Sequence, residues 1–188
     1  MGDGLKPLAQ TQTATDMFHV FSQNWFLGSI FGSLFTMLVQ SSSAAIGILQ
    51  TLYELNAQGI DSITLNGAIP VLLGANVGTT ITAVLASIGG NTESKRASFI
   101  HILFNLVSLL FFLVILIPYE NFVAWFEAKF LEQYSRGTIA FAHAFQNITM
   151  TFLMYWFIHP MIKLAKIVVK DNSNKIIPEE IFTTWRRN

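Results

Sequence analysis

The distribution of charged residues constrains this chain more than any other feature of its sequence. Only 12% of its 188 residues are charged, and long segments contain no Asp, Glu, Lys or Arg. A transmembrane helix needs roughly 17 to 25 mostly apolar residues, and each charge-free segment is at least that long. The sequence therefore predicts an all-α integral membrane protein that crosses a lipid bilayer several times. The charge-free segments are Val20–Tyr53, Ser62–Thr92, Ala97–Tyr119 and Gly137–Ile162.

Other features of the composition limit the kinds of molecule that the chain is expected to bind. The net charge is zero, which does not indicate a polyanionic partner, so we predict no nucleic-acid binding. Cysteine is absent, which excludes disulfides and thiolate metal sites. The opening residues, MGDGLKPLAQTQTATD, lack the basic and then apolar pattern of a signal peptide. We interpret residues 1–19 as a connector that continues from the end of a preceding helix, with Gly4 and Pro7 as helix breakers.

Polar residues and helix breakers interrupt the first two charge-free segments. Segment 20–53 carries a Gln-Ser-Ser-Ser cluster near its middle, and segment 62–92 carries Pro70, Gly74 and Gly78 near its centre. Irregular backbone at membrane depth persists only where it lines a cavity or is buried in protein. We therefore predict a re-entrant hairpin over 20–53 and a broken helix over 62–92.

The two later charge-free segments are simpler. Residues 97–119 end at Pro118, and residues 137–162 carry Pro160 near their end. Each segment is about one bilayer thickness at roughly 1.5 Å per residue. We predict that each forms one span, so that residues 20–170 make up a single transmembrane region.

Basic residues predict how the chain is oriented. The connection Glu120–Arg136 contains three Glu residues against Lys129 and Arg136, whereas two basic residues precede the third segment and three follow the fourth. The positive-inside rule places such basic residues in the cytoplasm. We therefore expect the C-terminus, with tail 171–188, to be cytoplasmic and the Glu120 connection to face outward. The basic residues are Lys95, Arg96, Lys163, Lys166 and Lys170.

The Gln-Ser-Ser-Ser cluster follows a stripe of small residues. Gly28, Gly32, Thr36 and Gln40 recur every four residues, a spacing that lets a neighbouring helix approach closely. If the helix breaks at this cluster, Ser41, Ser42 and Ser43 begin a second half-helix, whose free N–H groups and positive dipole suit an oxyanion such as phosphate. The alternative is that the serines only hydrogen-bond carbonyls of their own helix.

Two further sets of polar residues lie in the later segments. Asn76, Thr79 and Thr80 offer neutral oxygens of the kind that transporters use for Na⁺; alternatively, they belong to a glycine-rich packing seam. The segments SFIHILFN and AFAHAFQN each place His and Asn four residues apart, on one helical face. These pairs form either a polar core or interhelical hydrogen bonds that hold the bundle together. The paired residues are His101, Asn105, His143 and Asn147.

These motifs, in this order, resemble the sodium–phosphate cotransporter family. The family repeat carries Gln-Ser-Ser-Ser, then Gly-x-Asn-x-Gly-Thr-Thr, then a helix with His and Asn. This chain has them at 40–43, at 74–80 and at Arg96…His101…Asn105. The family transporter contains two inverted repeats, and this chain resembles the second. Its opening is similar to the segment between the repeats, so the first repeat or a second copy of the chain is an expected partner.

The resemblance implies specific roles for these residues. Phosphate is expected to bind the Gln-Ser-Ser-Ser cluster, and Na⁺ is expected as the coupling ion without any further cofactor. The function implied is sodium-coupled phosphate symport across the cytoplasmic membrane. The implied phosphate ligands are Gln40, Ser41, Ser42 and Ser43, and the implied sodium ligands are Gln40, Asn76, Thr79 and Thr80.

Two other functions fit the same residues. A phosphate-binding membrane subunit or sensor needs the same cluster but does not transport. An intramembrane hydrolase needs a serine activated by His101 or His143. The sequence has no Gly-x-Ser-x-Gly elbow, and its charge-free segments have no carboxylate to orient a His. We therefore predict that the chain is not an enzyme.

Overall fold

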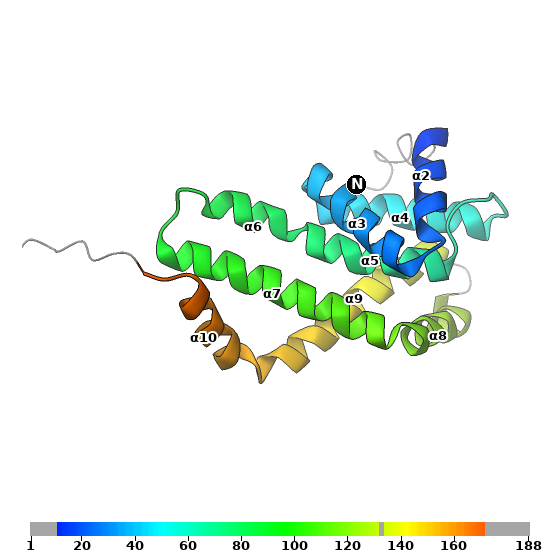
Figure 1. The fold of residues 1–188 in the computed structure, drawn as a ribbon. Helices are drawn as coiled ribbons and strands as arrows, with labels where there is room; N and C mark the ends of the chain where they lie inside the picture. Colours follow the sequence, from blue (N-terminus) through cyan, green and yellow to red (C-terminus); the bar gives the residue numbers. More distant parts are fainter. Residues whose placement is uncertain (1–10, 132–133, 172–188) are drawn as a thin grey trace, which may run out of the picture.

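The computed structural model describes residues 11–131 and 134–171, and within them every regular element is helical (Figure 1). The predicted all-α class is confirmed. Residues 1–10 of the expected connector and residues 172–188 of the expected tail lie outside the described residues. The elements are α2 (Gln12–Ser22), α3 (Trp25–Val39), α4 (Ser42–Ala57), α5 (Leu65–Gly78), α6 (Thr80–Ser87), α7 (Thr92–Val114), α8 (Leu116–Phe126), the π-helical turn η1 (Glu127–Leu131), α9 (Ser135–Tyr155) and α10 (Ile158–Val168).

The first charge-free segment contains a helical hairpin that turns at the Gln-Ser-Ser-Ser cluster. Helix α3 begins at the N-cap Asn24, whose side-chain oxygen accepts from the Phe26 and Leu27 N–H groups. It ends at Gln40, which has a left-handed backbone (φ 54°, ψ 24°). Ser41 is extended and caps α4. The predicted helix break therefore lies at Gln40, where the chain leaves one helix and starts the next.

Glycines let α3 and α5 pack with their backbones in contact. A Cβ atom at Gly32 would overlap the Val71 carbonyl, and one at Gly74 would overlap the Ser29 carbonyl. The Ser33 hydroxyl donates to the Gly74 carbonyl at 2.9 Å across the same contact. The predicted close approach along the small-residue stripe is thus confirmed, and its partner is α5.

The second charge-free segment, for which the sequence predicts a broken helix, contains two consecutive helices. Helices α5 and α6 are separated only by Thr79, which keeps helical angles (φ −58°, ψ −28°). Together they form a 23-residue element, Leu65–Ser87, that is long and apolar enough to cross a membrane. Gly74 and Gly78 lie within α5, where both pack closely against α3.

Proline divides each of the two expected single spans into two helices. Proline lacks an N–H, and its ring clashes with the carbonyl four residues earlier. For Pro118 that residue is Val114, where α7 ends. For Pro160 it is Trp156, which lies between α9 and α10, and these two helices meet at 81°. α7 is long and apolar enough to cross a membrane, and α9 with α10 forms a bent candidate span.

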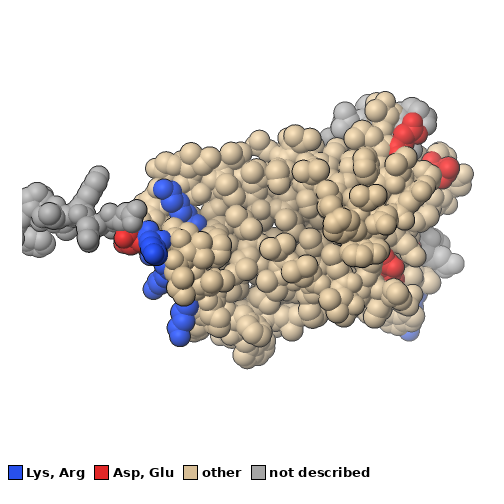
Figure 2. Space-filling view, in the orientation of Figure 1, with Lys and Arg blue, Asp and Glu red and all other residues tan. Residues whose placement is uncertain are grey.

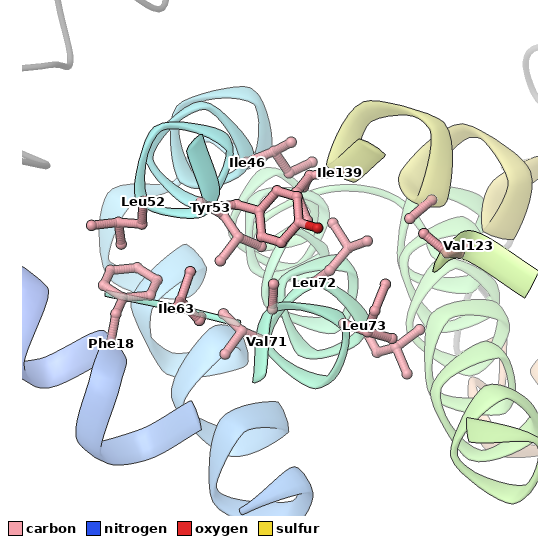
Figure 3. Packing of buried hydrophobic residues seen from close by; sticks show 14 of the residues in the cluster. Phe18, Ile46, Leu52, Tyr53, Ile63, Val71, Leu72, Leu73, Val123 and Ile139 are labelled. Atoms are coloured by element: carbon pink, nitrogen blue, oxygen red, sulfur yellow. The ribbon is translucent and has the colours of Figure 1, made fainter. Parts of the chain in front are cut away.

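The apolar core surrounds α5 (Figure 3). Ile69, Leu72 and Leu73 of this helix are fully buried. Leu52 of α4 and Ile139 of α9 pack against the same cluster and are also fully buried. α5 is therefore the central helix, which fixes the position of the polar residues at its C-terminal end.

Charged side chains gather at the two ends of the molecule (Figure 2). Most Lys and Arg residues lie at the end formed by the start of α7 and by α10, while most Asp and Glu residues lie at the opposite end. The wide surface between the ends is uncharged, as expected for a surface that faces lipid.

Candidate functional site

Residues from four helical segments line one cavity of about 290 Å³. The residues come from the start of α4, the junction of α5 and α6, the middle of α7 and the middle of α9. The three polar motifs and the second His/Asn pair therefore meet, although they are far apart in the sequence. The lining residues are Ser42, Asn76, Thr79, His101, Phe104, Asn105, His143 and Asn147.

The α4 N-terminus supplies hydrogen-bond donors to this region. The Ser41 hydroxyl accepts from the Ala44 N–H at 3.3 Å, and the Ser41 carbonyl accepts from the Ala45 N–H at 3.0 Å. The Ser42 and Ser43 N–H groups lie in the first turn, where a helix offers no acceptor of its own. Ser41 Oγ and Ser43 Oγ are 3.3 Å apart. The positive end of the α4 dipole is thus combined with hydroxyl groups.

Asn76 is the centre of a buried hydrogen-bond chain. Its Nδ2 donates to Gln146 Oε1 at 2.8 Å, and Gln146 Nε2 donates to Ser108 Oγ at 3.2 Å. Asn76 Oδ1 lies 3.1 Å from His143 Nε2. Because an amide oxygen only accepts, His143 Nε2 is the nitrogen that carries the proton in this arrangement. Asn76 therefore presents its oxygen on the side of His143.

The remaining polar side chains of the site bond mainly to their own helices. The Thr79 hydroxyl donates to the Ala75 carbonyl at 2.9 Å, and the Thr80 hydroxyl donates to the Val77 carbonyl at 2.7 Å. The Asn105 amide donates to the His101 carbonyl at 3.0 Å. These bonds use the donors of the side chains, so their oxygen lone pairs stay available as acceptors.

The structure brings some of the predicted site residues to the cavity and leaves others beside it. All four members of the His/Asn pairs line the cavity, together with Ser42, Asn76 and Thr79. Gln40 and Ser43 are exposed at the turn of the hairpin, and Ser41 is half-buried there. Thr80 is buried and is not a lining residue.

Three residues near the cavity are absent from the sequence prediction. Gln146 is fully buried and Ser108 almost so, and both belong to the Asn76 hydrogen-bond chain. Phe104 forms part of the wall. Gln146 follows His143 by three residues, a spacing that places both on one helical face. That spacing is a signal from which Gln146 can be predicted.

The cavity lining is polar and neutral. None of its lining residues is Asp, Glu, Lys or Arg. No group of three or more His, Cys, Asp or Glu residues that fits a metal ion occurs within residues 11–131 and 134–171. Amide and hydroxyl oxygens can coordinate an alkali cation, and free N–H groups with hydroxyls can bind an oxyanion.

The chain resembles several known proteins along most of its length. It is 31% identical over 159 residues to "Uncharacterized protein YqeW" of Bacillus subtilis, which covers 83% of this chain and 50% of that protein. It is 27% identical over 165 residues to "Putative inorganic phosphate export protein YjbB" of Escherichia coli, covering 88% and 28%. It is 36% identical over 103 residues to human "Sodium-dependent phosphate transport protein 2B", covering 52% and 14%.

The chain thus spans half or less of the length of these relatives. No solved structure matches it. The model of one family, described as Na⁺/Pi-cotransporter, matches residues 1–154. That match includes the α3–α4 hairpin, Asn76 and both His/Asn pairs. With most of its length and all its polar motifs covered, the chain belongs to the Na⁺/Pi-cotransporter family.

Proposed function

We propose that this chain forms one of two repeats of a sodium-coupled symporter for inorganic phosphate in the cytoplasmic membrane. One observation carries the proposal: residues of all the polar motifs line a single neutral cavity. Membership of the Na⁺/Pi-cotransporter family gives the two solutes. In this account the C-terminal end, with its basic residues, faces the cytoplasm.

The hairpin is the proposed phosphate-binding element. Ser42 reaches the cavity, and the N–H groups of Ser42 and Ser43 lie at the positive end of α4. Gln40 and Ser41 complete the ligand set from the turn. These groups bind a phosphate without a basic side chain, so that a coupled cation can supply the compensating charge.

The proposed sodium ligands come mainly from the junction of α5 and α6. Asn76 and Thr79 line the cavity and Thr80 follows Thr79 directly, and we assign Gln40 to the same ligand set from the hairpin turn. Sodium bound there lowers the electrostatic cost of an anion in a low-dielectric site. Each net positive charge that crosses 100 mV contributes about 2.3 kcal/mol to inward transport.

The second half of the site comes from another repeat. Gln40 and Ser43 are exposed in this chain although they carry polar groups at proposed membrane depth. A second repeat, from the rest of a longer protein or from another chain, is expected to cover them and to rock against this one during alternating access. The segregation of charge between the two ends favours one orientation of this chain, which disfavours an antiparallel pair of copies.

Flux measurements test this function. The complete natural gene product that contains this sequence is reconstituted in proteoliposomes, and uptake of radiolabelled phosphate is measured with Na⁺ or K⁺ gradients. We expect uptake to require Na⁺. Because a hydrogen bond to an ion contributes about 1.5–3 kcal/mol, Ser42→Ala should reduce uptake at low phosphate at least about ten-fold. Ser94→Ala, a serine in the first turn of α7 and outside the lining, is the matched control.

Two outcomes would replace this proposal. Phosphate that leaves the vesicles but does not enter them would assign export, the activity in the printed name of YjbB. Phosphate binding without flux in either direction would assign the non-transporting subunit or sensor. Equal uptake by Ser42→Ala and Ser94→Ala would remove Ser42 from the site.

A further inference from the structure

The bend between α9 and α10 encloses an apolar groove away from the polar cavity. The two helices meet at 81°, and a groove of about 310 Å³ lies on the inner side of the bend, against α7. Every residue along it is apolar, so it offers no hydrogen bonds to water. The lining residues are Leu103, Val107, Met154, Phe157, Pro160, Met161 and Leu164.

Contacts between α10 and α7 fix the bend. Met161 and Ala165 of α10 are buried where this helix packs on α7. At the far end of α10, Arg96 Nε donates to the Val169 carbonyl at 3.1 Å. These contacts tie α10 to α7, so the groove is a standing feature of the fold.

Aromatic residues indicate the depth of the groove in a membrane. Tyr155 and Trp156, at the bend itself, are 73% and 72% exposed. Exposed Tyr and Trp side chains are typical of the boundary between lipid tails and head groups. In Figure 1, α10 lies across the end of α7 and does not continue α9. The groove therefore opens at the level where lipid head groups meet their acyl chains.

The same end of the molecule is strongly basic (Figure 2). Lys163 and Lys166 are exposed three residues apart on α10, where this spacing places them on one face of the helix, and Lys170 is exposed just past the end of the helix. Of the described acidic residues at this end, Glu93 pairs with Arg96 at 2.6 Å and Asp171 accepts from the Thr92 hydroxyl. The three lysines therefore present a positive surface beside an apolar groove.

We propose that this elbow binds an anionic phospholipid of the cytoplasmic leaflet. An acyl chain occupies the groove between α7 and the bend, and the phosphate of the head group lies against Lys163, Lys166 and Lys170. Charge complementarity selects this occupant, since a basic helix next to an apolar groove at head-group depth fits an anionic amphiphile. The inference requires only that the chain lies in a bilayer and does not depend on phosphate transport.

Fluorescence quenching tests the lipid site directly. Trp156, next to the groove, is kept as the sole tryptophan by Trp25→Phe, Trp125→Phe and Trp185→Phe. The full chain is placed in phosphatidylcholine vesicles, and brominated phosphatidylglycerol or brominated phosphatidylcholine is titrated in. We expect the brominated anionic lipid to quench Trp156 with the higher relative binding constant. Lys166→Gln should lower that constant about five-fold, the contribution of one lysine near an anionic surface.

Controls separate this site from a general surface effect. Lys129→Gln, in the exposed π-helical turn η1 and away from the groove, should leave the constant unchanged. Val107→Phe, which fills the groove, should lower it with all lysines present. Equal constants for the two lipids, or equal effects of Lys166→Gln and Lys129→Gln, would overturn the proposal. Displacement of the lipid by inorganic phosphate but not by chloride at equal ionic strength would show a site for free phosphate instead.

Discussion

Asn76 connects the cavity to the interior of the helix bundle. Its amide nitrogen is held by Gln146, and its amide oxygen lies beside His143. A side-chain amide can present either its oxygen or its nitrogen to a ligand. Because Gln146 takes the nitrogen, Asn76 offers an acceptor, which favours a cation over an anion as its ligand. In the proposed site, Gln146 thus orients the group that Asn76 presents to the cavity.

Replacing Gln146 tests this selection. Gln146→Leu keeps the approximate size of the side chain but leaves the buried Asn76 amide nitrogen without its acceptor. An unsatisfied buried group costs about 1–3 kcal/mol, so we expect a lower thermal midpoint and a weaker apparent affinity for Na⁺. Gln58→Leu, at the exposed C-terminal end of α4, is the matched control. An apparent Na⁺ affinity equal to that of the unmodified protein would show that Gln146 only fills space.

The close packing of α5 against α3 depends on glycine. Gly74 lies where the α3 backbone passes closest, and a Cβ atom there would overlap the Ser29 carbonyl. Relief requires the two helices to separate, which also disturbs the Ser33 bond to the Gly74 carbonyl. The position of Asn76 relative to the α3–α4 hairpin follows from this contact, because Asn76 is only two residues further along α5.

The Gly74→Ala substitution therefore probes both stability and the site. Overpacking a close contact costs about 1–3 kcal/mol or more, and we expect a loss near the top of that range in the midpoint of unfolding in detergent. Gly28→Ala is the control on the same pair of helices, since its nearest neighbours would be at 3.4 Å or more from the new Cβ. Equal stability of the two variants would mean that the α3–α5 contact is loose.

The elements differ in how far the sequence predicts them. A polar cluster inside an apolar segment has no partner in lipid, so the break at Gln40 follows from the residues alone. Gly74 and Gly78 are ambiguous, because glycine permits both unwinding and close packing; here the packing against α3 decides. The two proline breaks have a local cause. Whether the chain keeps its direction past a proline depends on the helices packed around it. For α10, that helix is α7.

The site itself is less predictable than the elements. The His/Asn spacing indicates that these residues share helical faces, and both pairs line the cavity. Asn76 and His143 are 67 positions apart in the sequence. Their contact depends on how the helices pack around α5. Sequence periodicity gives the face of each helix but not which faces meet. Gln146 can be predicted only in part. The sequence shows that it lies three residues after His143 but does not show that it bonds to Asn76.

At the scale of the whole molecule, the structure has an uncharged surface between two charged ends and a polar hairpin turn exposed on one side. The uncharged surface is the kind that faces lipid. The exposed polar turn is explained if a second repeat covers it. The chain spans 50% of its Bacillus subtilis relative. Coupling between sodium and phosphate is therefore a property to measure on the complete natural protein.

The most direct test of a shared site is equilibrium binding of radiolabelled phosphate to that protein in Na⁺ and in K⁺. If both solutes occupy one cavity, Na⁺ tightens phosphate binding by a factor in the usual range for coupled sites, about 5- to 150-fold. Asn76→Leu should remove this dependence while leaving the affinity in K⁺ unchanged. Phosphate affinity that is the same in Na⁺ and K⁺ would contradict the account.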